Sequence, residues 1–185
     1  EKNYYNLIGS GREWIGEEFD LNTSYCCPFG FPKLVTGDSL KIKIKAISRS
    51  EITARYTFEI DNKRVGELSI PAISNYSSTT GTYANPGTSV FPAKANAPTF
   101  ILDINYNKPQ AKSEGYLDYI TVNARRALQF TPGQTLTFRD TRTVGNGNIS
   151  YFMLENANEN VHVWEITDIS NVKKIAARKI GNNPA

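Results

Sequence analysis

The sequence has few of the residues on which small catalytic and metal sites depend. Its 185 residues include two cysteines, one histidine and one methionine. The cysteines, Cys26 and Cys27, are adjacent, so they provide no disulfide framework and do not reveal the redox compartment. One histidine, His162, cannot support a typical zinc site. We therefore assign no metal ligand and no cofactor-binding residue, and leave open whether calcium is bound structurally.

Charge of one sign and long apolar runs are also missing. The chain has 21 basic and 18 acidic residues and a net charge of +3, too balanced to favour nucleic acid or an anionic membrane surface. No apolar run is long enough to cross a bilayer. The chain starts at Glu1, without an initiator methionine or a visible signal peptide, so we expect a processed or excised piece of a longer protein.

What the sequence does contain is alternation of apolar and polar residues. The segment 39–48 alternates Leu, Ile and Ala with three lysines, and 52–60 and 100–106 alternate in the same way. Each pattern predicts a strand with one buried and one solvated face. Asp61-Asn62 separates the second strand from another at 65–70, and both residue types tolerate positive φ, which predicts a tight hairpin.

The longest β-favouring run is 116–130, bounded by Gly115 and by Pro132-Gly133, which suits a type II turn. Its apolar residues fall on both faces, which predicts a central strand. Asp118 is flanked by apolar residues there, so we expect it to be paired with a neighbouring strand.

Shorter elements complete the chain. We predict a short strand in 12–19, a loop presenting aromatics at 27–32, and a long loop at 71–98 with one strand near 76–83. Further strands are predicted at 135–139, 149–154 and 161–167, with a turn at 168–171. No segment is a strong helix candidate, and the best is the basic tail 172–180.

Roughly ten strands joined by hairpin turns predict an all-β fold, an antiparallel β-sandwich with little or no helix. The long connection 71–98 favours a jelly roll, because it suits a crossover between sheets. We place the sandwich domain at 1–171. Residues 172–185 then form a C-terminal tail, or the start of a further strand or linker.

Candidate catalytic groups are sparse. Cys26 or Cys27 with His162 is the only nucleophile and base combination, but His162 alternates with valines like the polar face of a strand. Glu17, Glu18 and Asp20 are near neighbours, which favours a solvated surface over an acid and base pair. We assign no catalytic residue.

Two sets of residues are candidates for binding a partner or a glycan. The lysines are expected to line the solvated face of one strand, and an anionic polysaccharide is the alternative to a purely solvated role; they are Lys41, Lys43 and Lys45. Six aromatics expected in loops favour packing, with stacking on sugar rings as the alternative; they are Tyr25, Phe29, Phe31, Tyr76, Tyr83 and Phe91.

Three stretches, in this order, resemble one known region. They are Gly9–Phe19, Tyr116–Leu128 and Val163–Asp168. Together they resemble the region ahead of the peptidase domain in the type IX secretion system sortase of Bacteroidetes, a gingipain-like cysteine peptidase. The third is similar to that family's Val-Trp-Asp-Val-Thr-Asp-Pro signature. Glu165 replaces its Asp, Ile166 its second Val, and Ile169 stands where Pro is usual.

The resemblance implies a non-catalytic β module of an exported protein at the cell surface, at the outer membrane or in the periplasm. Such sortases remove the C-terminal signal domain of secreted cargo and can join the cargo to lipopolysaccharide. Their catalytic His precedes their Cys in the peptidase domain, whereas here the cysteines precede His162, so no catalytic residue carries over.

The partners implied are the peptidase domain of the same parent chain and, beyond it, cargo, other secretion components or lipopolysaccharide. The alternative function is a carbohydrate-binding module that recognises a cell-surface polysaccharide.

Overall fold

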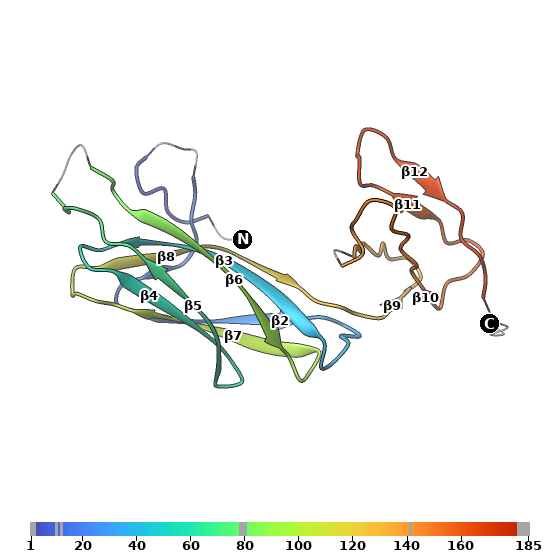
Figure 1. Cartoon of the computed structure of the whole chain (residues 1–185), viewed down its shortest axis with the longest axis horizontal. Helices are drawn as coiled ribbons and strands as arrows, with labels where there is room; N and C mark the ends of the chain where they lie inside the picture. Colours follow the sequence, from blue (N-terminus) through green and yellow to red (C-terminus); the bar gives the residue numbers. More distant parts are fainter. Residues whose placement is uncertain (1–2, 10, 12, 78–80, 141, 181–185) are drawn as a thin grey trace. The chain divides into compact units, whose positions relative to one another are not determined.

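The computed structural model of the chain describes residues 3–9, 11, 13–77, 81–140 and 142–180. They fall into two compact units, Glu1–Arg126 and Ala127–Ala185, which we call the sandwich unit and the second unit. No helix is present among these residues, and strands account for the regular structure of both units (Figure 1).

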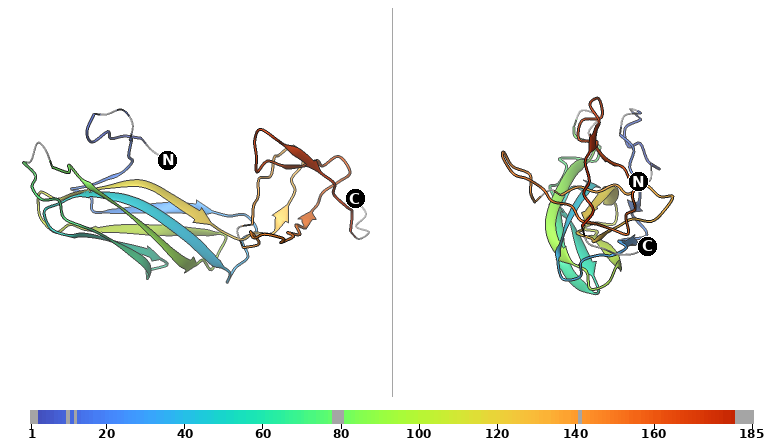
Figure 2. Two further views of the ribbon diagram at one scale, coloured as in Figure 1. Left: turned by 45° about the horizontal axis from the view of Figure 1, so that its top comes forward. Right: turned by 90° about the vertical axis from the view of Figure 1, so that its right-hand side faces the viewer.

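The sandwich unit consists of two four-stranded sheets, ordered β1-β8-β3-β6 and β2-β7-β4-β5. All neighbouring strands in both sheets are antiparallel. The strands are β1 (Glu18–Phe19), β2 (Ser24–Gly30), β3 (Ser39–Arg49), β4 (Ala54–Ile60), β5 (Lys63–Ile70), β6 (Asn85–Lys94), β7 (Thr99–Asn107) and β8 (Glu114–Asn123). Successive strands change sheet except at the β4–β5 hairpin, which can be followed in Figure 2. This is the strand order of a jelly roll, and the predicted antiparallel sandwich is confirmed.

The core of the sandwich follows from alternation along the strands. On β3, Ile42 and Ile44 are completely buried between the sheets, while the lysines beside them face outward. Phe58 on β4 is also fully buried and stacks on Phe91 of β6, with ring centroids 5.2 Å apart. Gly66 on β5 allows this packing, because a Cβ there would lie 2.6 Å from the Phe91 ring. The two sheets therefore meet through interdigitated side chains.

The Asp61-Asn62 turn forms as predicted. Both residues have positive φ, 52° and 59°, and they join β4 to β5. Positive φ at both central positions is the geometry of a type I′ turn, whose twist matches that of the flanking strands.

The predicted strand at 116–130 is shorter than expected, although it is an interior strand of its sheet as predicted. β8 ends at Asn123, and the chain then pairs with an earlier loop through a bridge between Leu34 and Arg126. β8 has β3 on one side and only the two-residue β1 on the other. β3, which pairs with both β8 and β6 over most of its length, is the central strand of this sheet.

Two edge strands contain prolines and were not predicted at their observed positions. The segment 27–32 was expected to be a loop, but Pro28 lies within β2. In 71–98 the strand is β6, which contains Pro86 and Pro92, and the described residues of 76–83 form turns and bends. Both β2 and β6 are at the edge of a sheet, where a residue without an N–H group is tolerated.

The second unit has only very short strands. They are β9 (Leu128–Gln129), β10 (Leu154–Glu155), β11 (Val163–Glu165) and β12 (Lys173–Ile175). β9 pairs with β10 in parallel, and β11 with β12 in an antiparallel hairpin.

Several predictions for the second unit are wrong. The strand predicted at 135–139 is absent from the described residues, that at 149–154 is reduced to β10, and the candidate helix at 172–180 contains β12 instead. The turns are confirmed: Gly133 has φ of 78° after Pro132, and Asn171 donates to the carbonyl of Asp168. The domain boundary predicted after residue 171 falls inside the second unit, between the two hairpin strands, and that division stays a prediction.

Candidate interaction surface

The candidate nucleophiles and the candidate base belong to different units. Cys26 and Cys27 lie on β2 in the sandwich unit, and His162 is an exposed residue just before β11 in the second unit. A hydrogen bond to the Asp103 carboxylate raises the pKa of the Cys26 thiol. A raised pKa lowers the thiolate fraction, the reverse of what activates a nucleophile.

Within the described ranges, no three His, Cys, Asp or Glu side chains are grouped as metal ligands would be. No helix in these ranges is long and apolar enough to span a membrane.

The lysine stripe on β3 divides into exposed and paired members. Lys41 and Lys43 are exposed, and the Lys43 ammonium lies 5.4 Å from the centre of the Tyr119 ring. Lys45 instead lies 2.7 Å from the carboxylates of both Asp118 and Glu13. The hydrogen bond to Asp118, followed by that to Glu13, raises the pKa of Lys45 well above its ordinary value.

The Asp118 side chain is 9% exposed, and its partner comes from the neighbouring strand β3. The prediction of a paired, structural Asp118 is therefore confirmed. Since Lys45 is held by two carboxylates, Lys41 and Lys43 are the members of the stripe that remain available to an anionic partner.

Most of the six candidate aromatics are engaged in packing. Tyr25 and Phe29 lie in β2 rather than in a loop, and with Phe31 they are partly buried against the core. Phe91 was also expected in a loop, but it lies in β6 and is buried against Phe58. Any role of these residues as glycan contacts stays a prediction.

Tyr76 and Tyr83 lie in the β5–β6 connection and hold one arginine between them. The Arg49 guanidinium is 4.5 Å from the centre of the Tyr76 ring and 4.1 Å from that of Tyr83. It also donates to the Tyr83 hydroxyl at 3.0 Å and lies 3.6 Å from the Glu114 carboxylate. These cation–π and charged contacts anchor the connection to the end of β3.

Neighbouring groups strengthen this anchor. The Tyr76 hydroxyl lies within hydrogen-bond distance of the carbonyls of Arg49 and Lys112, and burial raises the pKa of Tyr76 to about 12. Lys112 pairs with Glu51, whose carboxylate also accepts the Tyr76 backbone N–H. Sequence reasoning missed Arg49, because a charged residue at a strand end carries no pattern that names its partner.

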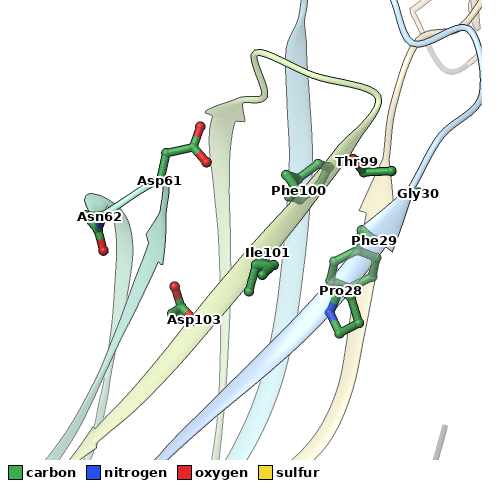
Figure 3. Close-up of a pocket in the computed structure, with 9 residues that line it drawn as sticks. All are labelled: Pro28, Phe29, Gly30, Asp61, Asn62, Thr99, Phe100, Ile101 and Asp103. Carbon is green, nitrogen blue, oxygen red and sulfur yellow. The ribbon is translucent and has the colours of Figure 1, made fainter.

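One hollow lies at the end of the β2-β7-β4-β5 sheet (Figure 3). Its volume is about 660 Å³, and its lining combines two carboxylates with an amide and apolar groups; the lining residues are Pro28, Phe29, Gly30, Asp61, Asn62, Thr99, Phe100, Ile101 and Asp103. In Figure 3, Asp61 and Asp103 both lie to the left of the exposed Ile101, with Asp61 above Asp103. Neither a histidine nor a lysine lines the hollow, so these carboxylates face no side-chain base or cation in its wall.

Exposed large apolar residues occur more densely along the second unit than along the longer sandwich unit. None of its described residues is buried, and the core residues of the protein all precede it in sequence. Its apolar surface consists of Val144, Ile149, Tyr151, Phe152, Met153, Trp164, Ile166, Ile169, Val172, Ile175 and Ile180. A group of exposed large apolar residues at this density is a candidate interaction surface. Sequence reasoning missed this surface, since it assigned these residues to sandwich strands or to a tail.

No protein-family model matches the chain, and no curated protein matches it. Among solved structures, the chain is similar to dimeric latent PorU from Porphyromonas gingivalis, with a TM-score of 0.75 and 16% sequence identity. The likeness covers 98% of this chain and 17% of the PorU chain, so the chain spans about a sixth of that protein. At this identity the likeness shows the fold.

Two carbohydrate-binding modules share less of the structure. One is the module CBM36 in complex with calcium and xylotriose, with a TM-score of 0.38 and 15% identity over 54% of this chain and 72% of the module. The other is the CBM36-1 domain of a xylanase from the hindgut metagenome of Trinervitermes trinervoides, with the same TM-score and 10% identity over 54% and 69%. Likeness at this level bears on no functional argument.

Proposed function

We propose that the chain is a non-catalytic structural and interaction module of a secreted, outer-membrane cysteine peptidase, a sortase of the type IX secretion system that removes C-terminal signal domains from cargo. The observation that carries the proposal is the likeness to PorU, which extends over 98% of the chain and includes both units. The three motif stretches named above also fall in both units, two in the sandwich and one in the second.

The chemistry of the described residues supports a non-catalytic role. A peptidase nucleophile needs a base beside it and donors for the oxyanion. Cys26 instead contacts a carboxylate that raises the pKa of its thiol. The charged side chains of Arg49 and Lys45 are engaged in contacts within the sandwich unit.

The parent polypeptide provides the test. An antibody raised against this chain should detect, in membrane fractions of the organism that makes it, a polypeptide several times larger. Mass spectrometry of the captured polypeptide should identify a peptidase domain with a catalytic His followed by a Cys. A free-standing polypeptide, or a parent without a peptidase domain, contradicts the proposal.

Isolated chain and parent should then differ in activity. The chain alone should not cleave a cargo protein that carries a C-terminal signal domain, whereas the parent polypeptide should cleave it. Cleavage by the isolated chain that is lost in Cys26→Ala or Cys27→Ala would instead show an enzyme in its own right.

The second candidate, binding of a cell-surface polysaccharide, is favoured by one observation. Lys41 and Lys43 are exposed on the outer face of β3, and Lys43 lies over the Tyr119 ring, which combines positive charge with an aromatic face. Binding to anionic polysaccharide that is lost in Lys41→Ala/Lys43→Ala, and kept in a Lys63→Ala control on β5, supports it. No binding to a broad glycan panel rejects it.

A further inference from the structure

The second unit lacks a core of its own. None of its described residues is buried. Phe138 and Phe152 form an aromatic pair in this unit, with ring centroids 5.1 Å apart. Its strands are two or three residues long. A two-stranded hairpin is marginal in water by itself, and stable sheets need further strands or a packed face.

The β11–β12 hairpin exposes apolar side chains on each of its two faces. Directly opposed residues share a face, so Val163 and Ile175 point to one side. Trp164, opposite Lys174, points to the other. Trp164 is 52% exposed and Ile175 43% exposed. Each face of the hairpin therefore carries exposed apolar area beside charged side chains, and a layer of another domain on each side would bury that area.

The backbone edges of the hairpin are also open. β11 and β12 form a two-stranded sheet, so each strand has one edge to which no other strand of the described chain is bonded. Open edges present rows of N–H and C=O groups that pair readily with a further strand.

Charge narrows the chemistry of the partner. After Asp168, the chain to Ile180 contains the basic residues Lys173, Lys174, Arg178 and Lys179 and no acidic residue. The same stretch carries exposed apolar side chains, among them Ile169 and Val172. A complementary surface is therefore apolar with carboxylates beside it.

We propose that the second unit, Ala127–Ala185, is a docking segment that is completed by a folded β-rich domain elsewhere in the same polypeptide. That domain adds a strand to the β11–β12 hairpin and covers its two faces with apolar groups flanked by carboxylates. This inference rests on the proposed function, since it requires a longer parent chain, and it names the surface by which the module contacts the rest of that chain.

The hairpin offers two open strand edges and exposed apolar groups on both faces, and other occupants would satisfy only part of this. A lipid bilayer covers apolar groups but has no backbone groups for a strand edge. A second copy of the chain in a two-fold arrangement uses one patch on each copy and leaves the opposite face of the hairpin exposed. A protein domain with an open sheet edge and two layers meets all of these requirements.

Hydrogen exchange read by mass spectrometry tests the docking, in the isolated 185-residue chain and in its longer parent polypeptide. In the isolated chain, the amides of β11 and β12 should exchange at close to unprotected rates, while those of β3 are strongly protected. In the parent, the β11 and β12 amides should slow by about 100-fold or more, because opening then requires undocking.

A charged substitution with a matched control sharpens the test. Trp164→Glu in the parent should return the hairpin amides to fast exchange. Leu21→Glu, at a 98% exposed leucine of the sandwich unit, should leave them protected. Equal effects of the two variants overturn the proposal.

The remaining outcomes are decisive as well. Protection of the hairpin in the isolated chain overturns the proposal, whether it is intrinsic, arises on dimerisation seen by analytical ultracentrifugation, or appears only with vesicles of anionic phospholipid. An unprotected hairpin in the parent also overturns it. If the hairpin is protected in a parent that has no peptidase domain, the docking stands and the proposed function fails.

Discussion

The two units contain similar residues and differ in what those residues achieve. In the sandwich unit, strands β2 to β8 are 7 to 11 residues long, and alternate side chains meet those of the facing sheet. In the second unit the strands are two or three residues long, and valines, isoleucines and aromatics remain in contact with water. An apolar strand pattern is thus necessary for a core, but a core also needs a second layer at the correct distance.

This difference predicts where the stability of the chain lies. Burial of apolar area is the main favourable term in folding, and nearly all of it is in the sandwich unit. We expect substitutions of the same kind to have very different costs in the two units.

The largest difference should come from removing a phenylalanine ring. Phe58→Ala leaves a cavity between the sheets and should lower the free energy of unfolding by about 3–5 kcal/mol. Phe152→Ala, at a half-exposed ring of the second unit, should cost less than about 1 kcal/mol. Urea unfolding followed by circular dichroism measures both. Similar costs would mean that the second unit has a core of its own.

Adding a methyl group tests the spacing of the sheets. Gly66→Ala would place a Cβ 2.6 Å from the Phe91 ring, so the sheets must shift, at a cost of about 1–3 kcal/mol. Gly30→Ala is the control, because its Cβ would meet only a Thr99 methyl at 3.9 Å, and it should change stability by about 0.5 kcal/mol or less. Thermal unfolding measures the stability of both variants. A larger loss of stability in Gly30→Ala than in Gly66→Ala would contradict the close approach of Phe91 to Gly66.

An ion pair on the outer face of the sandwich should have a smaller effect. Asp118→Asn removes the partially buried partner of Lys45 and should cost about 1–3 kcal/mol near neutral pH. Glu165→Gln, opposite Lys173 in the exposed hairpin, should cost about 0.5 kcal/mol or less. Denaturant unfolding of both variants compares the partially buried ion pair of the sandwich unit with the exposed pair of the second unit.

The pH dependence of the Asp118 effect has a definite sign. The pKa of Lys45 is raised in the folded state, so its contribution is fully present below its ordinary pKa of about 10.4. It is lost as the pH rises through the raised value. The difference in unfolding free energy between the unsubstituted 185-residue chain and Asp118→Asn should therefore narrow at strongly alkaline pH. A difference that widened there would contradict the pairing of Lys45 with Asp118 as its cause.

The smallest effect should come from deleting the second unit. A chain that ends at Arg126 keeps both sheets and the Leu34–Arg126 bridge, and its unfolding midpoint should match that of the 185-residue chain. Far-UV circular dichroism in a urea titration compares them. A large loss of stability would show that the sandwich depends on the second unit, and would break the comparison.

Parts of the fold could be predicted because they are encoded locally. The alternation of apolar and polar residues in β3, β4 and β7 predicts which of their residues are buried. The Asp61-Asn62 turn follows from the positive φ values that those two residue types tolerate. The pairing of Asp118 could be predicted as well, since a carboxylate among apolar neighbours needs a partner.

Other parts could not be predicted, because they depend on position within a sheet. Pro28 and Pro92 are compatible with strands only at an edge, and edge position is decided by the order of the strands. The contacts of Arg49 join residues far apart in the sequence, so they carry no local pattern. The same applies to Phe91, whose burial depends on the opposite sheet.

The all-β class of the chain and the inward faces of its long strands could be predicted from the sequence, because they follow from composition and from the two-residue period of a strand. Only the tertiary structure decided which apolar residues are buried. In the sandwich unit a facing sheet covers them, whereas among the described residues no second layer buries the apolar residues of β11 and β12. Burial depends on what lies opposite a strand, and that is a property of the assembled chain.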